Sequence, residues 1–414
     1  MTNRRVVVTG TGVISPVGNT TEEFWKNLLE GYCGIDYISN FPTDDLPVKI
    51  AGEVKNFNPA EYGIEPGFVR KQDKFTVFAV AAANSALKES GLISGENGNI
   101  DPFRLGVYVG SGIGGFNVMY RECEKMIKDG AKWISPLFIP TMISNIAAGN
   151  IAIRANACGP CVPVVTACAT STHTIGEAFR AIKHGYADAI IAGGAEAATI
   201  PLGIAGFANA KALSKAEDPK YASLPFNQNR GGFVMAEGAC MLVLEEYEHA
   251  KARGANIIAE VCGYGNTCDA HHVTAPRPDG VTQSQAIKMA LEEAEYGNED
   301  VLYINAHGTG TALNDSSETH AFKLALGEDA YKAHVSSTKS MTGHMLGAAG
   351  AVEALACILA LRDGIVPPTI NLDTPDPECD LDYTPNKAVK ANLTIAISDS
   401  LGFGGHNGCV AFRK

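Results

Sequence analysis

Short apolar runs rich in β-branched residues recur along this chain, and most of them end in a glycine-rich turn. Such runs occupy residues 6–8, 105–109, 189–192 and 301–304. Buried strands have this composition, and helical patterns separate several of the runs. Alternating strands and helices are typical of α/β proteins. The sequence therefore predicts an α/β fold, and this regularity constrains the architecture more than any other feature.

Two strand–turn–helix units have matching patterns. In the first, a predicted strand at 162–166 leads through small residues into a helix whose apolar positions have helical spacing: Ile175, Ala178, Phe179 and Ile182. In the second, a strand at 335–339 precedes a predicted helix over 347–362. Both helices end on the same apolar–basic–polar–glycine pattern. This repetition predicts an internally duplicated protein, which we divide into residues 1–256 and 257–414.

Other elements follow from the same signals. Residues 6–18 are interpreted as a strand followed by a glycine-rich turn, because Pro16 interrupts any dinucleotide-binding fingerprint. The stretch 74–87 is apolar on most sides, which predicts a buried helix. Residues 395–398 are expected to form the last strand of the chain.

Composition narrows the partners and the compartment. The chain has 414 residues, of which 46% are hydrophobic and 19% charged, and its net charge is −12. This acidic balance argues against nucleic acid as the main partner. No apolar run approaches the roughly 18 residues that span a bilayer, and the N-terminus resembles a strand rather than a signal peptide. Eleven cysteines without framework spacing favour reduced thiols, so we expect a cytoplasmic protein without membrane contacts.

Cys168 lies in the turn of the first unit, between small residues. The first N–H groups of a helix are unpaired and carry partial positive charge, which lowers the pKa of a thiol below its usual value of about 8.5. The position therefore favours Cys168 as a nucleophile. The alternative is a small buried hydrophobic residue, which is the usual role of a cysteine.

Two histidines have settings that match that of Cys168. His307 follows the strand at 301–305 and precedes glycine and threonine residues, and His344 follows Gly343 just before the second helix. A single histidine is more often structural than catalytic. Nucleophilic catalysis by cysteine needs a partner group, however, so the three residues form a candidate catalytic set.

Glu353 is the one charged residue in the apolar stretch 348–359. Such a helix is buried, and a buried carboxylate needs a partner, for which Lys339 in the preceding turn is the candidate. A structural ion pair and a functional one both fit these residues. No metal site is predicted, because the paired spacing of metal ligands is missing from Cys262, Cys268, Asp269, His271 and His272.

Four motifs, in order along the chain, resemble those of the β-ketoacyl-[acyl-carrier-protein] synthases. They are Ala167-Cys168-Ala169-Thr170-Ser171, Ala306-His307-Gly308-Thr309-Gly310-Thr311, Ser337-Thr338-Lys339-Ser340-Met341-Thr342-Gly343-His344 and Gly402-Phe403-Gly404-Gly405-His406-Asn407. The resemblance is closest to the free-standing type II condensing enzymes of bacterial fatty acid synthesis. It implies a homodimer with a duplicated thiolase-like fold, in which five αβαβα layers place two mixed sheets around buried helices.

The resemblance implies a decarboxylative Claisen condensation. Cys168 would hold an acyl chain as a thioester, and malonyl-acyl carrier protein would lose carbon dioxide to give the attacking enolate. His307 and His344 would donate hydrogen bonds to the malonyl thioester oxygen. Backbone N–H groups of Cys168 and Phe403 would bind the oxyanion at the acyl carbon. Three supporting positions of the family, including the gating aromatic, fall on Lys339, Glu353 and Phe403.

The resemblance also implies binding residues. Ile113 and Phe207 would line the acyl pocket, and Thr309 and Thr311 would bind the phosphopantetheine arm. No cofactor is implied, because phosphopantetheine arrives on the carrier protein. The acidic carrier would dock on basic side chains, which the family places at Arg70, Lys71, Lys132 and Lys211. The chain departs from many relatives, which have Phe and Thr, at Leu401 and His406.

Three other functions share features with this set. A thiolase has the fold and a cysteine, but its second half usually supplies a second reactive cysteine. A modular polyketide ketosynthase has the same cysteine and histidines within a far longer chain. A non-catalytic chain-length partner subunit typically lacks the nucleophile, so Cys168 argues against that role.

Overall fold

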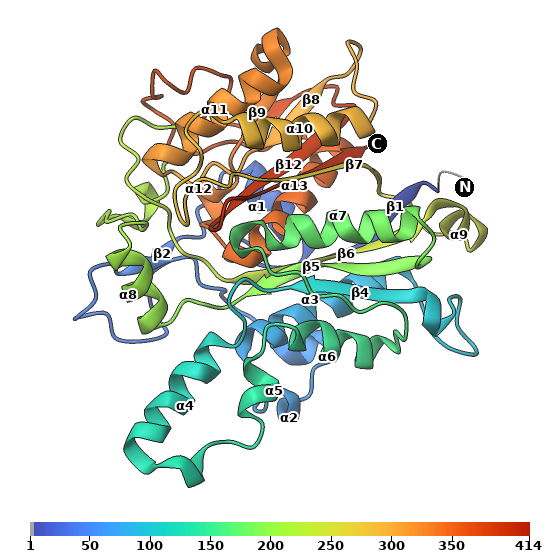
Figure 1. The fold of residues 1–414 in the computed structure, drawn as a ribbon, viewed down its shortest axis with the longest axis vertical. Helices are drawn as coiled ribbons and strands as arrows, with labels where there is room; N and C mark the ends of the chain where they lie inside the picture. The colour runs from blue at the N-terminus through green and yellow to red at the C-terminus, as the bar shows by residue number, and fades with distance from the viewer. Residues whose placement is uncertain (1–3) are drawn as a thin grey trace.

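The computed structural model describes residues 4–414, and its main feature is a mixed sheet of nine strands (Figure 1). In order across the sheet, the strands are β4 (Leu105–Gly110), β5 (Ala189–Glu196), β6 (Gly238–Glu246), β1 (Val6–Ile14), β7 (Ala259–Cys268), β13 (His406–Arg413), β12 (Ile395–Gly402), β8 (Leu302–Asn305) and β9 (His334–Ser336). Two small sheets stand apart from it: β2 (Asp36–Tyr37) with β3 (Ile50–Ala51), and β10 (Ile365–Val366) with β11 (Val389–Lys390).

The large sheet consists of two similar parts that meet at its centre. Moving outward, the first part has the order β1, β6, β5, β4, and the second has the order β7, β13, β12, β8, β9. The parts are joined by antiparallel pairing of β1 with β7, in which Val6, Val7 and Val8 face Val261, Glu260 and Ala259. The two predicted mixed sheets are therefore continuous through three residue pairs.

Helices cover both outer faces of the sheet and fill the space between its two parts (Figure 1). Side chains alternate between the faces of each strand, so Ile190 and Ala192 of β5 belong to the inner core and Ala189 and Ile191 to the outer one. The layers, from the first outer face to the second, are α3 (Lys74–Ser90) with α6 (Ile146–Ala155), the first part, α7 (Thr170–Lys183) with α13 (Ala349–Asp363), the second part, and α10 (Val281–Glu293) with α11 (Ala312–Leu326). These are the five layers that the resemblance implied.

The remaining helices connect or flank these layers. α4 and α5 project from the body of the molecule near α2 (Figure 1). Among residues 4–414, no helix combines the length and the apolar character that crossing a membrane requires. The bounds of this group are α1 (Thr21–Leu29), α2 (Pro66–Val69), α4 (Phe116–Asp129), α5 (Phe138–Met142), α8 (Pro201–Asn209), α9 (Tyr247–Ala252) and α12 (Lys339–Thr342).

Three sequence-based assignments were wrong. The glycine-rich turn predicted within residues 6–18 begins too early, because Gly10 and Gly12 lie inside β1. A Cβ at either glycine would overlap the carbonyl oxygens of Ala86 and Ala82, so these glycines permit close packing of α3. The stretch 395–398 is not the last strand, because β12 continues to Gly402 and forms a hairpin with β13.

The third error concerns the stretch ahead of Cys168. Residues 162–166 do not form a strand, and a single β-bridge joins Cys161 to Val107 of β4. Pro160 and Pro163 lack the N–H donors that a ladder needs, which accounts for the missing pairing. This stretch nevertheless occupies the position that β9 occupies in the second half, so the duplication extends to the element before each inner helix.

Candidate active site

Cys168 lies in a strained turn at the start of α7. The 3₁₀ turn η4 (Ala167–Ala169) contains it, and α7 continues directly from Thr170. Ala167 has a φ of 51°, a conformation that costs a residue with a side chain about 1–3 kcal/mol. The turn places the buried Cys168 on the wall of a cavity of about 310 Å³ between the two halves.

Burial raises the pKa of the Cys168 thiol to about 12, so the lowered pKa that the sequence predicted is wrong. Removal from water is the largest effect, and the Glu196 carboxylate acts in the same direction. Lys339 and the backbone N–H of Phe403 oppose it. Local sequence identifies the helix start, but not how deeply the second half covers the thiol. At neutral pH the Cys168 sulfur therefore keeps its proton until a reaction removes it.

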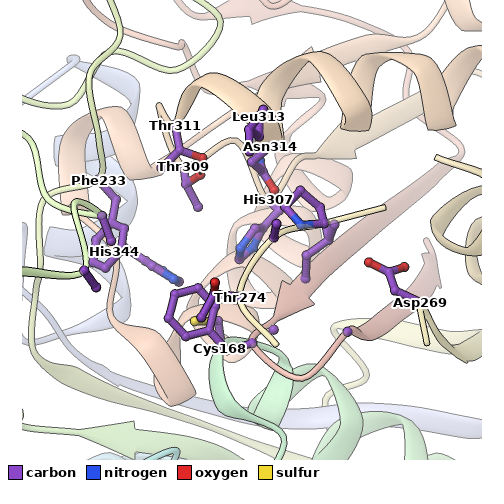
Figure 2. Close-up of a pocket in the computed structure, with 18 of the residues that line it drawn as sticks. Cys168, Phe233, Asp269, Thr274, His307, Thr309, Thr311, Leu313, Asn314 and His344 are labelled. Carbon is purple, nitrogen blue, oxygen red and sulfur yellow. Dashed lines mark hydrogen bonds between the residues drawn. The ribbon is translucent and has the colours of Figure 1, made fainter. Parts of the chain in front are cut away.

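His307 and His344 line the same cavity as Cys168 (Figure 2). His307 follows β8, and His344 lies between α12 and the 3₁₀ turn η7 (Leu346–Ala348). The two ring centroids are 5.2 Å apart, and the ring planes are nearly perpendicular at 88°. Burial lowers the pKa of both imidazoles well below the usual value, and Lys339 adds to that effect. Both rings are therefore neutral at pH 7, and each can donate one hydrogen bond.

Lys339 determines which nitrogen of His307 carries the proton. The Lys339 Nζ lies 3.4 Å from Nδ1 of His307 and also donates to the Glu353 carboxylate. An ammonium group can only donate, so Nδ1 accepts and the ring proton is on Nε2. Burial raises the pKa of Glu353, while Lys339 opposes that rise. The predicted Lys339–Glu353 pair is thus present, and it leaves Nε2–H of His307 as the donor for a substrate.

Glu318 holds the main chain of His307, and sequence analysis did not single it out. Its two carboxylate oxygens accept the backbone N–H groups of His307 at 2.6 Å and of Gly308 at 2.8 Å. Burial, followed by the nearby Asp399, raises the pKa of Glu318 well above its usual value. A signal existed in the sequence, since Glu318 lies three residues after Asp315 on the helix that follows the His307 loop.

Phe403 lies in the turn between β12 and β13, next to Cys168. β12 ends at Gly402, where a Cβ would lie 3.3 Å from the Cys168 nitrogen. Gly404 and Gly405 have φ values of 93° and 80°, which only glycine adopts readily. The backbone N–H of Phe403 faces the Cys168 thiol. The Phe403 N–H therefore lies beside the reactive sulfur, and its pairing with the Cys168 N–H as an oxyanion hole stays a prediction.

The other predicted binding residues fall into two groups. Thr309 and Thr311 line the cavity (Figure 2), and their hydroxyl oxygens are 2.9 Å apart. The exposed Lys211 belongs to the same lining. The remaining five are outside the lining of this cavity: Ile113, Phe207, Arg70, Lys71 and Lys132. Phe207 instead packs against the Phe403 ring, with centroids 6.3 Å apart. The roles of these five residues stay predictions.

A duplicated five-layer fold, with a cysteine from one half facing histidines from the other, defines a thiolase-like condensing enzyme. Family models make the assignment more specific. The model described as "Beta-ketoacyl synthase, N-terminal domain" matches residues 3–250, and that described as "Beta-ketoacyl synthase, C-terminal domain" matches residues 258–373. The chain belongs to the β-ketoacyl synthase family.

Curated relatives agree over the whole chain. A 3-oxoacyl-[acyl-carrier-protein] synthase 2 from Synechocystis sp. is 48% identical, with 99% of this chain and 98% of the relative covered. One of the same name from Staphylococcus aureus is 47% identical, with 100% and 99% covered.

Solved structures with the same fold include ketosynthases of other systems. A type II PKS acyl-carrier protein in complex with its ketosynthase bound to the hexaketide gives a TM-score of 0.91 at 36% identity, covering 99% of each chain. A β-ketoacyl synthase from Burkholderia phymatum gives a TM-score of 0.91 at 33% identity, also covering 99% of each chain.

Proposed function

We propose that this protein elongates acyl chains in fatty acid synthesis, by condensing an acyl group held on Cys168 with malonyl-acyl carrier protein. The observation that carries this function is the meeting of Cys168 with two neutral imidazoles, His307 and His344, on one cavity wall. The high identity to synthases of the 3-oxoacyl-[acyl-carrier-protein] type, over nearly their full length, supports the same reaction.

The first half-reaction transfers the acyl group. The Cys168 sulfur attacks the thioester carbonyl of the acyl carrier, its proton passes to the departing phosphopantetheine sulfur, and the carrier leaves as a thiol. Because the pKa of Cys168 is about 12, the proton has to leave during the attack rather than before it. The backbone N–H groups of Cys168 and Phe403 bind the oxyanion that forms at the carbonyl.

The second half-reaction forms the carbon–carbon bond. Malonyl thioester loses carbon dioxide, and the electron pair of the broken bond becomes an enolate whose oxygen accepts hydrogen bonds from His307 and His344. The enolate carbon then attacks the acyl thioester on Cys168 and expels the sulfur as a thiolate, which takes up one proton from water to restore the thiol as the β-ketoacyl carrier forms. Two neutral donors suit this step, because a proton given to the enolate would quench the nucleophile.

The carrier protein, the homodimer and the compartment are parts of the same proposal. The solved complex of a related ketosynthase with its acyl-carrier protein supports carrier docking here, and Lys211 lines the cavity where an acidic partner would approach. Val162 and Val165 are 45% and 50% exposed beside the β4 edge, which supports its coverage by a second copy of this chain. None of the eleven cysteines is paired within residues 4–414, which suits the cytoplasm.

A polyketide-type ketosynthase is the second candidate, since two solved relatives at 35–36% identity belong to polyketide or ketosynthase/chain-length-factor systems. Higher identity to the fatty acid enzymes favours elongation. The two activities differ in what happens to the product. A polyketide-type enzyme extends its β-keto product again without reduction, whereas a fatty acid enzyme stops after one addition.

One coupled assay tests both candidates. Purified protein, Cys168→Ala and the exposed-cysteine control Cys123→Ala would each receive a medium-chain acyl carrier and malonyl carrier, with products followed by intact mass. We expect a single two-carbon β-ketoacyl extension with wild type and Cys123→Ala, and none with Cys168→Ala. Repeated extensions would favour the polyketide function. The absence of both product and acyl adduct on Cys168 would contradict the condensing function.

A further inference from the structure

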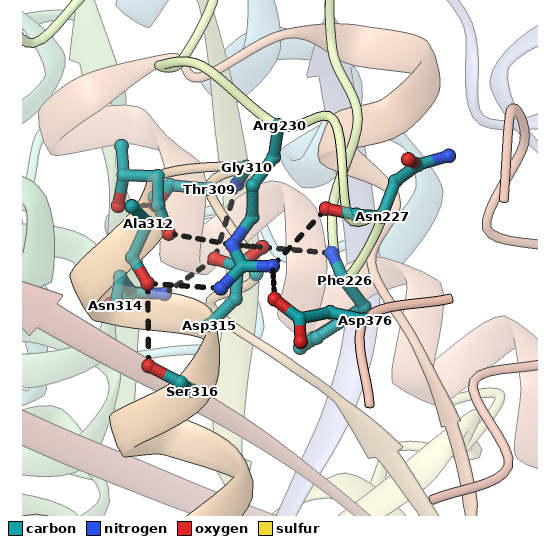
Figure 3. Close-up of polar contacts among 12 residues, drawn as sticks. Phe226, Asn227, Arg230, Thr309, Gly310, Ala312, Asn314, Asp315, Ser316 and Asp376 are labelled. Atoms are coloured by element: carbon teal, nitrogen blue, oxygen red, sulfur yellow. Dashed lines mark hydrogen bonds and ion pairs between the residues drawn. The ribbon is translucent and has the colours of Figure 1, made fainter. Parts of the chain in front are cut away.

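Arg230 is an arginine with a nearly inaccessible side chain that neither lines the cavity nor takes part in the chemistry derived above. Its side chain is 5% exposed, and it lies in the loop that follows Phe226. A guanidinium is strongly hydrated in water, so an arginine side chain this inaccessible has to be matched by acceptors. Figure 3 shows that its acceptors come from three separate segments of the chain.

Two of these acceptors are carbonyl oxygens at the start of α11. Nε of Arg230 donates to the Thr311 carbonyl at 3.2 Å. Nη2 donates to the Ala312 carbonyl at 3.0 Å (Figure 3). Nη1 donates to the Asn227 carbonyl at 3.1 Å and to the Asp376 carboxylate at 2.5 Å. Arg230 therefore links the segment that contains Thr311 to the loop of Asn227 and to the loop of Asp376.

Asp315 also holds this segment in place, through a hydrogen bond to the backbone of Gly310. Its Oδ1 accepts the backbone N–H of Gly310 at 3.2 Å, and its Oδ2 accepts the backbone N–H of Phe226 at 2.8 Å. Arg230 Nε lies 3.8 Å from Oδ2, so the charges of this fully buried carboxylate and of the guanidinium offset each other. Gly232 completes the set, since its N–H donates to the Gly310 carbonyl at 3.0 Å.

The segment held in this way is the one that presents hydroxyl groups to the cavity. Thr309 and Thr311 flank Gly310, and both line the cavity that contains Cys168. Gly310 has a φ of 75°, which other residues adopt only with strain, so the segment needs external support to keep this shape. The hydrogen bonds of Arg230 and Asp315 are attached to its backbone and leave the threonine side chains free to face a ligand.

We infer that Arg230 is a positioning residue that fixes the Thr309–Gly310–Thr311 backbone for the amide- and hydroxyl-bearing arm of the carrier-bound substrates. This inference rests on the proposed function. Arginine is suited to the task because its planar fork reaches two adjacent carbonyls and a carboxylate at once, whereas lysine places all its donors on one atom. Asp376 orients the guanidinium and acts in the same direction more weakly.

The test compares Arg230→Lys with Arg413→Lys. Arg413 is a matched control, because it also donates to backbone carbonyls, of Ala294 and Glu295, and to a carboxylate, Asp300, but it lies at the end of β13 and outside the cavity lining. We expect Arg230→Lys to raise KM for malonyl carrier and for acyl carrier roughly tenfold, with kcat changed less than about twofold. The rate of Cys168 alkylation by iodoacetamide stays at the wild-type value.

A purely structural role predicts a different result. In that case Arg230→Lys and Arg413→Lys lower Tm and the active fraction alike, with KM unchanged, and the inference is overturned. If Arg230→Lys does not fold, Asp376→Asn provides the test instead. We expect this variant to raise KM for both carriers about threefold while the rate of Cys168 alkylation stays unchanged. Absence of condensation by the wild-type protein would instead count against the proposed function, which keeps the two failures apart.

Discussion

The two halves of this protein build the same turn at the start of their inner helices, but only one of the two turns is reactive. Cys168 lies in η4 ahead of α7, and Gly347 lies in η7 ahead of α13. The residues before them, Ala167 and Leu346, have φ values of 51° and 47°. Gly347 is therefore the counterpart of Cys168 in the second half.

What differs is the group that meets each turn. At Cys168, β12 ends in Gly402, whose small size lets the Phe403 N–H reach the thiol. At Gly347, the equivalent strand β5 ends in Glu196, whose Oε2 accepts the N–H of Gly347 at 3.1 Å and of Gly112 at 2.9 Å. The second turn binds a carboxylate that belongs to the protein, and the first is left for an oxyanion of the substrate. Each half thus contains an anion-binding turn, and the Glu196 side chain occupies the one at Gly347.

The largest effect we expect comes from removing the histidines that distinguish the reactive turn. His307 follows the end of β8 at the same distance as Gly112 follows the end of β4, so Gly112 is its counterpart. Glycine has no side chain, and the second turn therefore has no imidazole donor at this position. His307→Ala and His344→Ala should each lower the rate of condensation by about 10³, since each removes a preorganised donor from a water-poor site. Alkylation of Cys168 by iodoacetamide should persist, and its loss would indicate damage to the turn instead.

Placing a cysteine in the closed turn should destabilise the protein rather than create a second site. A Cβ at Gly347 would overlap the Gly112 nitrogen and lie 2.8 Å from Glu196 Oε2. Gly347→Cys should therefore destabilise the protein by about 3 kcal/mol, as measured by urea unfolding. Gly149→Cys is the matched control, because a Cβ there meets no atom within 4 Å. Equal stability of the two variants would show that the second turn is not closed.

The pH dependence of Cys168 alkylation should reflect the burial of its thiol. With a pKa of about 12, the thiolate fraction grows with each pH unit, and alkylation should accelerate about a hundredfold between pH 7 and 9. Cys168→Ala, measured under the same conditions, removes the contribution of other thiols. A rate that levels off below pH 8 would instead support the lowered pKa expected for a helix start.

The smallest effect concerns Asp399 on β12, a buried carboxylate less well matched than Glu196. Its Oδ2 accepts from Gln283 Nε2 at 2.8 Å, and Oδ1 has no hydrogen-bond partner among residues 4–414. Burial raises the pKa of Asp399 from 3.8 to about 6, so the folded protein binds a proton that the unfolded chain has already lost. This contribution to stability is present below about pH 4 and is lost as the pH rises through 6.

Asp399→Asn removes that dependence. At pH 7 the variant should be more stable than wild type by on the order of 2 kcal/mol, and the difference should vanish at pH 4. Urea unfolding at the two pH values measures it. A variant that is less stable at pH 7 would show that the ionised carboxylate has a partner of its own.

Sequence patterns located the reactive groups because each of them stands in a turn of glycines and small residues. His307 follows strand β8, whereas Cys168 and His344 lie in turns that precede α7 and α13, and the family motifs made all three specific. Glu196 and Glu318 were missed because a sequence does not show whether a carboxylate faces water or backbone N–H groups.

Other features depend on contacts between distant segments. Gly10 and Gly12 suggested a turn, whereas close approach of α3 is the reason for them. The pKa of Cys168 depends on Lys339 and on the Phe403 turn, both of which are distant along the chain. Local propensity carries no information on either point, so no reading of nearby residues could have supplied it.

The hairpin of β12 and β13 has a consequence for how this protein is made. A ribosome delivers Cys168 long before the Phe403 turn, which is completed only when the final strand, His406–Arg413, emerges. Until then the nascent chain carries its thiol without the second oxyanion donor and without a finished second half. Catalytic competence therefore arises only after β13 has been translated, and a chain truncated before β12 should fold part of its core while remaining inert toward acyl thioesters.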